Sequence, residues 1–290
     1  MTEFLNAVVN GIGLGAVYGL VAVGIALLFK STGLLNFAHG ILMTTGALMA
    51  SAMVSGGRSF WTAAAIAIAV TGLIGGLIHL SVIRPLATRG LFAGVMVTIG
   101  LSEVIHGILS IHYGPGQRLL PPPIKVSQIE VFGGARISST LLLCGGVVLL
   151  AVGALALLFR FTLLGVQLRG AAVNPQLATG FGANLAVIFT IAWVVAAALG
   201  ATAGILLGTL SVIELTLGDF ALRAFTALIV GGADSIPGAL VGGLVVGVVE
   251  LLSGTYLGSE YRVVATMALL LVFLVARPTG LFGSGTLRRV

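Results

Sequence analysis

Five stretches of the sequence are apolar over the length that a helix needs to cross a membrane, a sixth is shorter, and together they decide the fold class. A membrane-spanning helix needs roughly 20 apolar residues. The stretches lie at 8–29, 60–83, 91–113, 138–159, 185–213 and, the shortest, 263–276. Of the 290 residues, 58% are hydrophobic and only 8% are charged, which is too few charges for a soluble domain. The sequence therefore predicts an all-α, polytopic transmembrane helical bundle.

Two further apolar stretches are interrupted by polar residues. Residues 31–55 contain Asn36 and His39, which helices that face lipid exclude. Residues 224–250 contain the motif GGADSIPG, whose glycines, acid and proline favour two half-helices over one straight rod. The predicted helix break consists of Gly231, Gly232, Asp234, Ser235, Pro237 and Gly238. With these two stretches we expect about eight membrane segments, some of them broken or re-entrant.

The positive charges predict the orientation in the membrane. Lys and Arg residues are scattered singly between apolar runs, so they indicate cytoplasmic loops and do not form a basic stripe for nucleic acid. If Lys30, the Arg84–Arg89 turn and the Arg160–Arg169 loop are cytoplasmic, the N-terminus lies outside. The C-terminal tail with Arg277, Arg288 and Arg289 is then inside only if residues 224–250 enter and leave the membrane as a broken hairpin.

Polar residues within or beside apolar segments are candidates for a translocation pathway, because hydrocarbon leaves their hydrogen bonds unsatisfied. They are Asn10, Asn36, His39, Thr45, Glu103 and His106. The alternative role for such residues is to hold neighbouring helices together. Glu103 and His106 share a helical face, so they form either a buried hydrogen-bonded pair or a metal or proton-relay site. Glu250 precedes a polar loop and is interpreted as an interfacial charge.

Catalytic motifs are missing from the sequence. It contains neither G-x-S-x-G nor H-E-x-x-H. Residues 24–31, GIALLFKS, have the length of a phosphate-binding loop, but Phe29 stands where the second glycine is needed. We therefore expect neither an enzyme nor a resident metal or cofactor.

The loop 160–184 has the pattern of a short capped helix. Asn174 is a suitable N-cap, Pro175 suits the first helical position, and Gly182 suits the end. Leu177 and Phe181 then share one face and form an apolar knob. Either this knob docks on a partner protein, or the helix lies flat on the lipid surface with Arg160 and Arg169 as anchors.

Several stretches together resemble the permease subunits of branched-chain amino-acid ABC importers, the Liv type, over nearly the whole chain. They include GLLNFAHG at 33–40, RPL at 84–86, AFTALIVGGADSIPGALVGGLVVGVVE at 224–250 and RPTGLFG at 277–283. The resemblance implies a single permease domain over 1–290 in the bacterial inner membrane. Its halves 1–159 and 185–290, which we hypothesise to be repeats, would be joined by a cytoplasmic coupling loop, 160–184.

The resemblance also implies the partners. They are a second permease subunit, two ATP-binding subunits that carry ATP and Mg, and an extracytoplasmic solute-binding protein. The coupling residues would be Arg169, Val173, Asn174, Pro175, Leu177 and Phe181. Val173 stands where family members commonly carry Glu, so docking is expected to depend on Leu177 and Phe181.

The solute is left open by the sequence. Branched-chain amino acids are the first expectation from the resemblance, and urea, short amides or aromatic acids are alternatives. A different class, an ion-coupled secondary transporter, would use Glu103, His106 and Asp234 as proton sites.

Overall fold

A computed structural model describes residues 2–86, 90–131 and 134–283, and these residues are largely helical. The first helices are α1 (Thr2–Thr32), α2 (His39–Ser55), α3 (Phe60–Ile78), the π-helix η1 (His79–Ile83), α4 (Arg84–Leu86) and α5 (Leu91–Tyr113). Next come strands β1 (Gln128–Glu130) and β2 (Arg136–Ser138), then α6 (Ser139–Phe161), α7 (Leu163–Val173), α8 (Pro175–Gly180) and α9 (Leu185–Leu210). The last elements are the 3-10 turn η3 (Leu215–Asp219), α10 (Phe220–Gly231), α11 (Ile236–Tyr256) and α12 (Tyr261–Ala276). Arg89, Arg288 and Arg289, which the orientation argument uses, lie outside the described residues.

Within the described residues, six helical segments are long and apolar enough to cross a membrane. They are α1, the continuous run Phe60–Leu86, Phe92–Tyr113 of α5, α6, α9 and α11. The helices α2, α7 and α12 are apolar but shorter. These findings confirm the predicted all-α polytopic fold.

Packing divides the chain into two compact units. Unit 1 contains residues 1–26, 121–148 and 219–290, and unit 2 contains residues 27–120 and 149–218. The helices α1 and α6 each contribute to both units. The expected division into 1–159 and 185–290 stays a prediction.

Unit 2 is built on α9, against which α2 and α3 pack. Glycines allow the close approach: a Cβ on Gly46 would overlap Ala201, and a Cβ on Gly204 would overlap the backbone of Met43. In membrane proteins, small residues let helix backbones pack closely. Burial of apolar surface does not drive helix association there, because the surrounding lipid is itself apolar. The buried indole of Trp193 lies in this unit, with its ring centroid 6.1 Å from that of His79.

The π-helix at the end of α3 has a local cause. Pro85 has no N–H and its ring displaces the backbone of the preceding turn, so the regular hydrogen-bond pattern cannot continue. The N–H of Arg84 accordingly bonds to the carbonyl of His79, five residues earlier. The His79 side chain is fixed there, because its Nδ1 lies 2.8 Å from the Thr190 hydroxyl of α9.

Unit 1 contains the broken helix that the sequence predicted, as α10 and α11. Gly231 ends α10, Gly232 has a φ of +106°, and the Ser235 hydroxyl caps α11 by accepting from the Gly238 N–H at 3.1 Å. Pro237 lies in the first turn of α11. With 12 residues, α10 is about 18 Å long at 1.5 Å per residue, too short for a full crossing.

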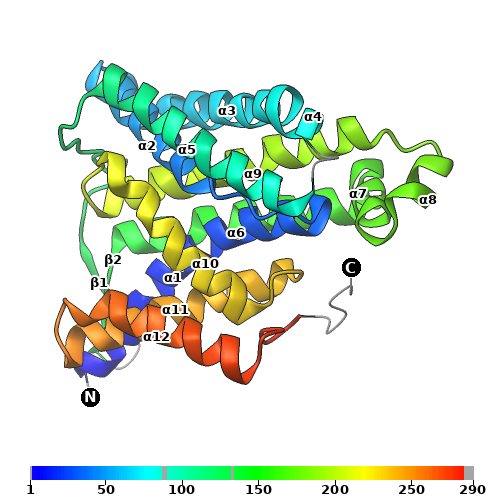
Figure 1. Ribbon diagram of the computed structural model, residues 1–290. Helices are drawn as coiled ribbons and strands as arrows, with labels where there is room; N and C mark the ends of the chain where they lie inside the picture. The colour runs from blue at the N-terminus through cyan, green and yellow to red at the C-terminus, as the bar shows by residue number, and fades with distance from the viewer. Residues whose placement is uncertain (1, 87–89, 132–133, 284–290) are drawn as a thin grey trace. The chain divides into compact units, whose positions relative to one another are not determined.

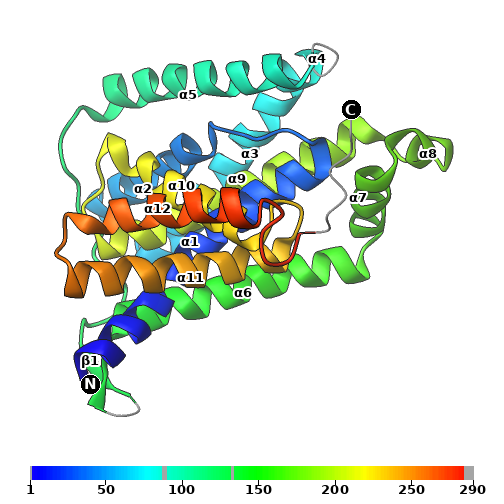
Figure 2. The same cartoon turned by 60° about the horizontal axis from the view of Figure 1, so that its bottom comes forward.

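The segment after α12 closes the broken end of α10. The N–H groups of Leu281 and Phe282 donate to the carbonyls of Val230 and Gly231, at 2.8 and 3.0 Å. Figures 1 and 2 both show α10, α11 and α12 side by side. The end of α12 therefore lies beside the break. The hairpin that enters and leaves the membrane before α12 crosses stays a prediction.

Glycines also bring α1 and α11 together within unit 1. Gly11, Gly15 and Gly19 recur at every fourth residue of α1, and a Cβ at any of them would overlap α11. On the facing side, Gly243 and Gly247 have the same spacing. This arrangement matches the small-residue contacts of membrane helices.

The connection between α5 and α6 contains a short antiparallel hairpin, in which Ile129 of β1 pairs with Ile137 of β2. The sequence analysis predicted no strand there. Asn6 and Asn10 of α1 hold it: Asn6 Oδ1 accepts from the Arg136 N–H at 2.6 Å, and Asn10 Nδ2 donates to the Arg136 carbonyl at 2.9 Å.

We predict that Gly231→Ala destabilises the protein, because its Cβ would overlap the Gly238 carbonyl. Overpacking of this kind costs about 1–3 kcal/mol. The matched control is Gly107→Ala in α5, where a Cβ meets no atom of the described chain within 4 Å and the alanine favours the helix. Thermal unfolding in detergent should show a lower midpoint for Gly231→Ala alone. Equal midpoints for the two variants would contradict this packing.

Candidate functional site

Asn36 lies in the short connection between α1 and α2, and it is fully buried. Gly33, with a φ of +71°, turns the chain away from the end of α1. The Asn36 Oδ1 then accepts from the N–H of Ala38 at 3.0 Å, which fixes the turn. Within the described chain its Nδ2 has no hydrogen-bond partner. One half of the amide therefore holds the backbone, and the other half is an unused donor.

His39 begins α2 and is 1% exposed. Its ring packs against Gly200 of α9, where a Cβ would stand 3.2 Å from Nε2. Both ring nitrogens lack a partner among the residues that the structure describes. Burial of a polar group without a hydrogen bond costs roughly 2–7 kcal/mol, so groups left in this way point to a ligand or a conformational change.

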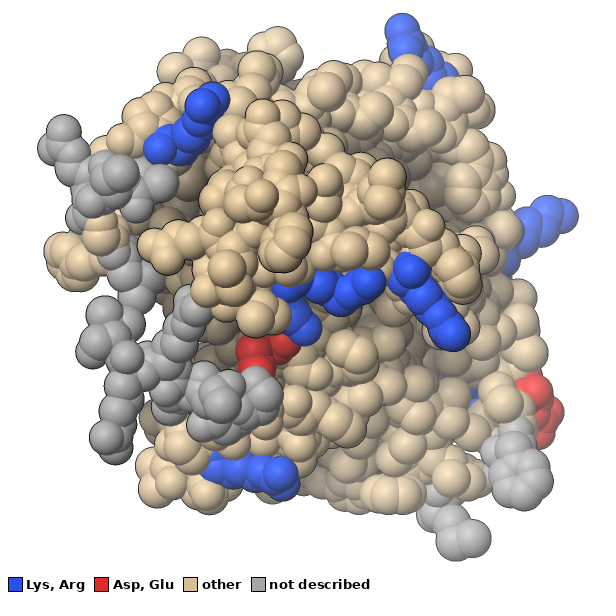
Figure 3. All heavy atoms as spheres, turned by 90° about the vertical axis from the view of Figure 1, so that its right-hand side faces the viewer, with Lys and Arg blue, Asp and Glu red and all other residues tan. Residues whose placement is uncertain are grey.

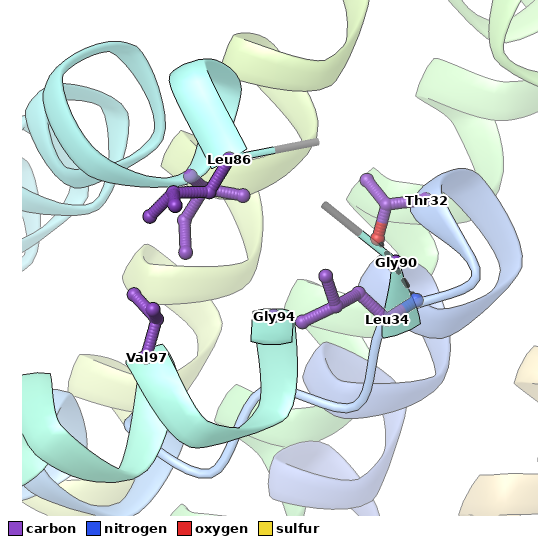
Figure 4. A pocket seen from close by; sticks show the side chains of 7 residues that line it. Thr32, Leu34, Leu86, Gly90, Gly94 and Val97 are labelled. Carbon is purple, nitrogen blue, oxygen red and sulfur yellow. Dashed lines mark hydrogen bonds between the residues drawn. The ribbon is translucent and has the colours of Figure 1, made fainter. Parts of the chain in front are cut away.

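A pocket of about 220 Å³ lies near this turn in unit 2 (Figure 4). Apart from Thr32, its lining side chains are apolar, and Leu34, Leu86 and Val97 point towards it. The Thr32 hydroxyl accepts a hydrogen bond from the Leu34 N–H at 3.3 Å. Ligand sites usually measure about 300–1,000 Å³ and carry convergent polar groups. None of the predicted pathway residues lines this pocket, so it does not define the solute site.

Two other pathway candidates have partners in the structure. Asn10 donates to the Asn6 and Arg136 carbonyls, so it ties α1 to β2. The Thr45 hydroxyl is buried and donates to the Ile41 carbonyl at 2.7 Å within α2. These contacts give Asn10 a structural role in holding neighbouring elements together, which was the alternative to a pathway role.

Glu103 and His106 differ from the expected buried pair. Glu103 is exposed on α5, a helix whose main packing partner is α2, and His106 is half-buried. In the described residues the two side chains form neither an ion pair nor a hydrogen bond, and no group of three potential metal ligands occurs. The sequence spacing placed them on one face correctly, but it could not show which way that face points.

The loop 160–184 contains two helices, α7 and α8, whose N-termini are capped by side chains, and both lie in unit 2. Thr162 caps α7, since its hydroxyl accepts from the Gly165 N–H at 3.1 Å. Arg169 donates to the Phe159 carbonyl and so ties α7 to the end of α6. Asn174 caps α8 by accepting from the Leu177 N–H at 3.0 Å, Pro175 is the first residue of α8, and Gly182 follows with a φ of +83°.

Apolar side chains of this loop are strongly exposed. Phe181 is 91% exposed, Val173 75% and Leu177 62%. A capped helix that presents such side chains from a polar connection is the arrangement expected of a docking element. The geometry alone does not distinguish a protein partner from a lipid surface.

The sequence analysis missed a charged cluster in unit 1. Arg223 of α10 forms an ion pair with Glu250 of α11, with 3.5 Å between Nε and Oε2, and Tyr18 of α1 donates to Glu250 Oε1 at 3.3 Å. Glu250 is 4% exposed, so the helices of unit 1 enclose it, and its interpretation as an interfacial charge stays a prediction. A lone Arg and a lone Glu within apolar helices were the available signal, because such charges rarely occur there without a partner.

Charged side chains are sparse on the surface as well. Most of the face in Figure 3 consists of uncharged residues, and Lys and Arg occupy few places on it. Together with the membrane-length helices and the buried polar turn, this surface defines the class: a multi-pass helical membrane protein with polar groups buried inside it.

Comparison with known proteins gives the family. Residues 7–275 match the family described as the permease component of branched-chain amino acid transport systems. The chain belongs to this family and is a multi-pass protein of the inner membrane that serves transport.

The relatives cover almost the whole length. The high-affinity branched-chain amino acid transport system permease protein LivH of Escherichia coli is 32% identical over 302 residues, covering 99% of this chain and 98% of LivH. The corresponding protein BraD of Pseudomonas aeruginosa is 30% identical with the same coverage. A probable LivH of Methanocaldococcus jannaschii is 27% identical over 91% of this chain and 88% of that protein.

A solved structure supports the fold. PsaBC from Streptococcus pneumoniae, determined in complex with Fab, aligns with a TM-score of 0.51 over 93% of this chain and 91% of that chain. The sequences are 14% identical, so the likeness concerns the fold alone.

We predict that Asn36→Leu lowers solute uptake by about tenfold while expression stays normal, because both the unused Nδ2 donor and the turn acceptor are lost. Asn36→Ser separates the two effects, since its hydroxyl can still accept from Ala38 but the amide donor is gone; it should also lower uptake. The control is Thr44→Val, which removes a buried hydroxyl bonded within its own helix. Normal uptake by Asn36→Leu at normal expression would contradict a role in the pathway.

Proposed function

We propose that the chain is the permease subunit of an ATP-driven importer and forms the translocation pathway for branched-chain amino acids. The observation that carries this proposal is the family match over residues 7–275. Relatives named as branched-chain amino acid permeases also match this chain over 98% of their own length. The buried nitrogens of Asn36 and His39, which have no partner within the described residues, supply polar groups for the solute. A polar solute needs such groups to replace its hydration.

Energy comes from other subunits in this proposal. Residues 24–31, the one stretch with the length of a phosphate loop, are helical within α1, so their backbone N–H groups are used inside the helix. We propose that ATP and Mg bind two separate ATP-binding subunits at the cytoplasmic face. A second permease subunit and an extracytoplasmic solute-binding protein complete the complex.

The helix α8 transmits the motion in this account. A conformational change crosses an interface only through a stiff contact, and the Asn174 cap with Pro175 makes α8 stiffer than a free loop. The anchoring of Arg169 on the Phe159 carbonyl joins this loop to α6. Leu177 and Phe181 fill a groove on the ATP-binding subunit, and such anchors often contribute more than about 2 kcal/mol.

Phe181→Ala tests the proposal in proteoliposomes that contain the complete complex. We expect it to release the ATP-binding subunits or to uncouple ATP hydrolysis from leucine uptake, while the permease still inserts and folds. The matched control is Phe92→Ala, which removes an equally large ring, 76% exposed, from α5; it should leave coupling unchanged.

Ionic strength gives a second measurement on the same complex. The contact is apolar, so co-purification of the ATP-binding subunits should depend only weakly on salt. A wild-type complex that dissociates at modestly raised salt, or a Phe181→Ala complex with normal coupled uptake, would contradict the proposed docking.

A further inference from the structure

Unit 1 contains an ion pair that is buried between membrane helices. Glu250 has 5% of its side chain exposed, and its partner Arg223 has 18%. Arg223 also lies over the Phe220 ring, with 4.4 Å between the guanidinium carbon and the ring centroid. The pair is therefore enclosed by α1, α10 and α11, where a charge without a partner is costly.

A third charged side chain joins the pair. Arg262, in the first turn of α12, packs against Gly254 of α11, where a Cβ would overlap its guanidinium. Asp219, one turn before Arg223, forms no ion pair within the described part of the chain. Arg262 thus adds a second guanidinium to the helices around one carboxylate, and one positive charge is in excess.

The pairing leaves hydrogen-bonding capacity unused. The Arg223 Nε and the Glu250 Oε2 approach only to 3.5 Å, and within the described residues neither atom makes a hydrogen bond; the Arg262 Nε is also buried and unpartnered. A buried ion pair stabilises a protein only when its geometry is good and its remaining hydrogen bonds are satisfied. Stability alone therefore gives no reason for this cluster.

The charged cluster lies near one end of the helices that form it. Arg223 is in the first turn of α10, Arg262 is in the first turn of α12, and Glu250 is in the last third of α11. With the hairpin orientation above, these are the ends of the helices that face outward. A solute delivered from outside reaches this level before it reaches the break at Gly232–Ser235.

We infer that Arg223 and Glu250, with Arg262, form the binding site for the zwitterionic head group of an amino acid. This inference rests on the proposed function and deepens it by naming which part of the solute is recognised. The solute's carboxylate binds the guanidinium of Arg223, and its ammonium group binds Glu250. When the solute binds, Arg223 and Glu250 each give up the other and bind the oppositely charged group of the solute.

The chemistry of the groups fits this exchange. A guanidinium binds a carboxylate through two parallel N–H···O bonds, and charge-assisted bonds of this kind are stronger than neutral ones. The Tyr18 hydroxyl holds one oxygen of Glu250, so the other oxygen is directed to the ammonium group. The second guanidinium, that of Arg262, adds a positive charge that attracts the carboxylate of the solute. Urea and short amides carry neither charge and gain nothing from the site.

The test is a double substitution, Arg223→Met with Glu250→Leu, in the complete complex with its solute-binding protein. Replacement of a buried ion pair by apolar residues of similar size is often neutral or stabilising. We therefore expect the complex to assemble, with a thermal midpoint lowered only as far as Tyr18 loses its hydrogen bond to Glu250 and Arg262 is left without that carboxylate. Leucine uptake per ATP hydrolysed by the assembled complex should fall at least about tenfold. If the pair only holds the helices together, the double variant should transport normally, and that result would overturn the inference.

A second measurement does not depend on the folding of a variant. In the wild-type complex in nanodiscs without the solute-binding protein, L-leucine should raise the thermal midpoint. At equal concentration 3-methylbutylamine and 4-methylpentanoate, which each lack one charge, should not. Equal shifts for all three compounds would overturn the inference while leaving the proposed function intact. Absence of leucine uptake by the wild-type complex would remove both.

Discussion

The structure depends on one constraint: inside hydrocarbon, each backbone and side-chain polar group has to find its partner within the protein. Helices meet this condition for the backbone, and the α10–α11 break shows how it is met where a helix stops. The Ser235 hydroxyl caps one side, and the N–H groups of Leu281 and Phe282 satisfy the carbonyls on the other. Backbone groups on both sides of the break are therefore hydrogen-bonded within the protein.

The same constraint makes the exceptions informative. Buried nitrogens of Asn36 and His39 in unit 2, and the loose Arg223–Glu250 pair in unit 1, do not have complete sets of partners among the described residues. A transport protein needs polar groups that can be given to a solute and taken back. Groups that are tightly bonded within the fold, such as Thr45 or Asn10, cannot be released at low cost.

Much of the fold could be predicted from the sequence, because it follows from local rules. Apolar length marks the spans, Gly232 and Pro237 mark the break, and Asn174, Pro175 and Gly182 mark the ends of α8. What could not be predicted depends on contacts between distant residues. The Tyr18–Glu250 hydrogen bond joins residues 232 positions apart. Likewise, no local pattern shows that Glu103 is on the exposed side of α5, because a three-residue spacing fixes a face but not its direction. The hairpin at 128–138 was missed because its strands are only three residues long and are held by Asn6 and Asn10 of a remote helix.

The central claim is that this chain forms a pathway for branched-chain amino acids that moves only when separate subunits hydrolyse ATP. The most direct measurement is uptake of labelled leucine into proteoliposomes, with urea and an aromatic acid as competitors. Samples would contain either the permease alone under an ion gradient or the complete complex with ATP. The account predicts uptake of leucine by the complete complex, no uptake by the permease alone, and no competition by urea. Uptake by the permease alone under a proton gradient, or transport of urea in place of leucine, would contradict it.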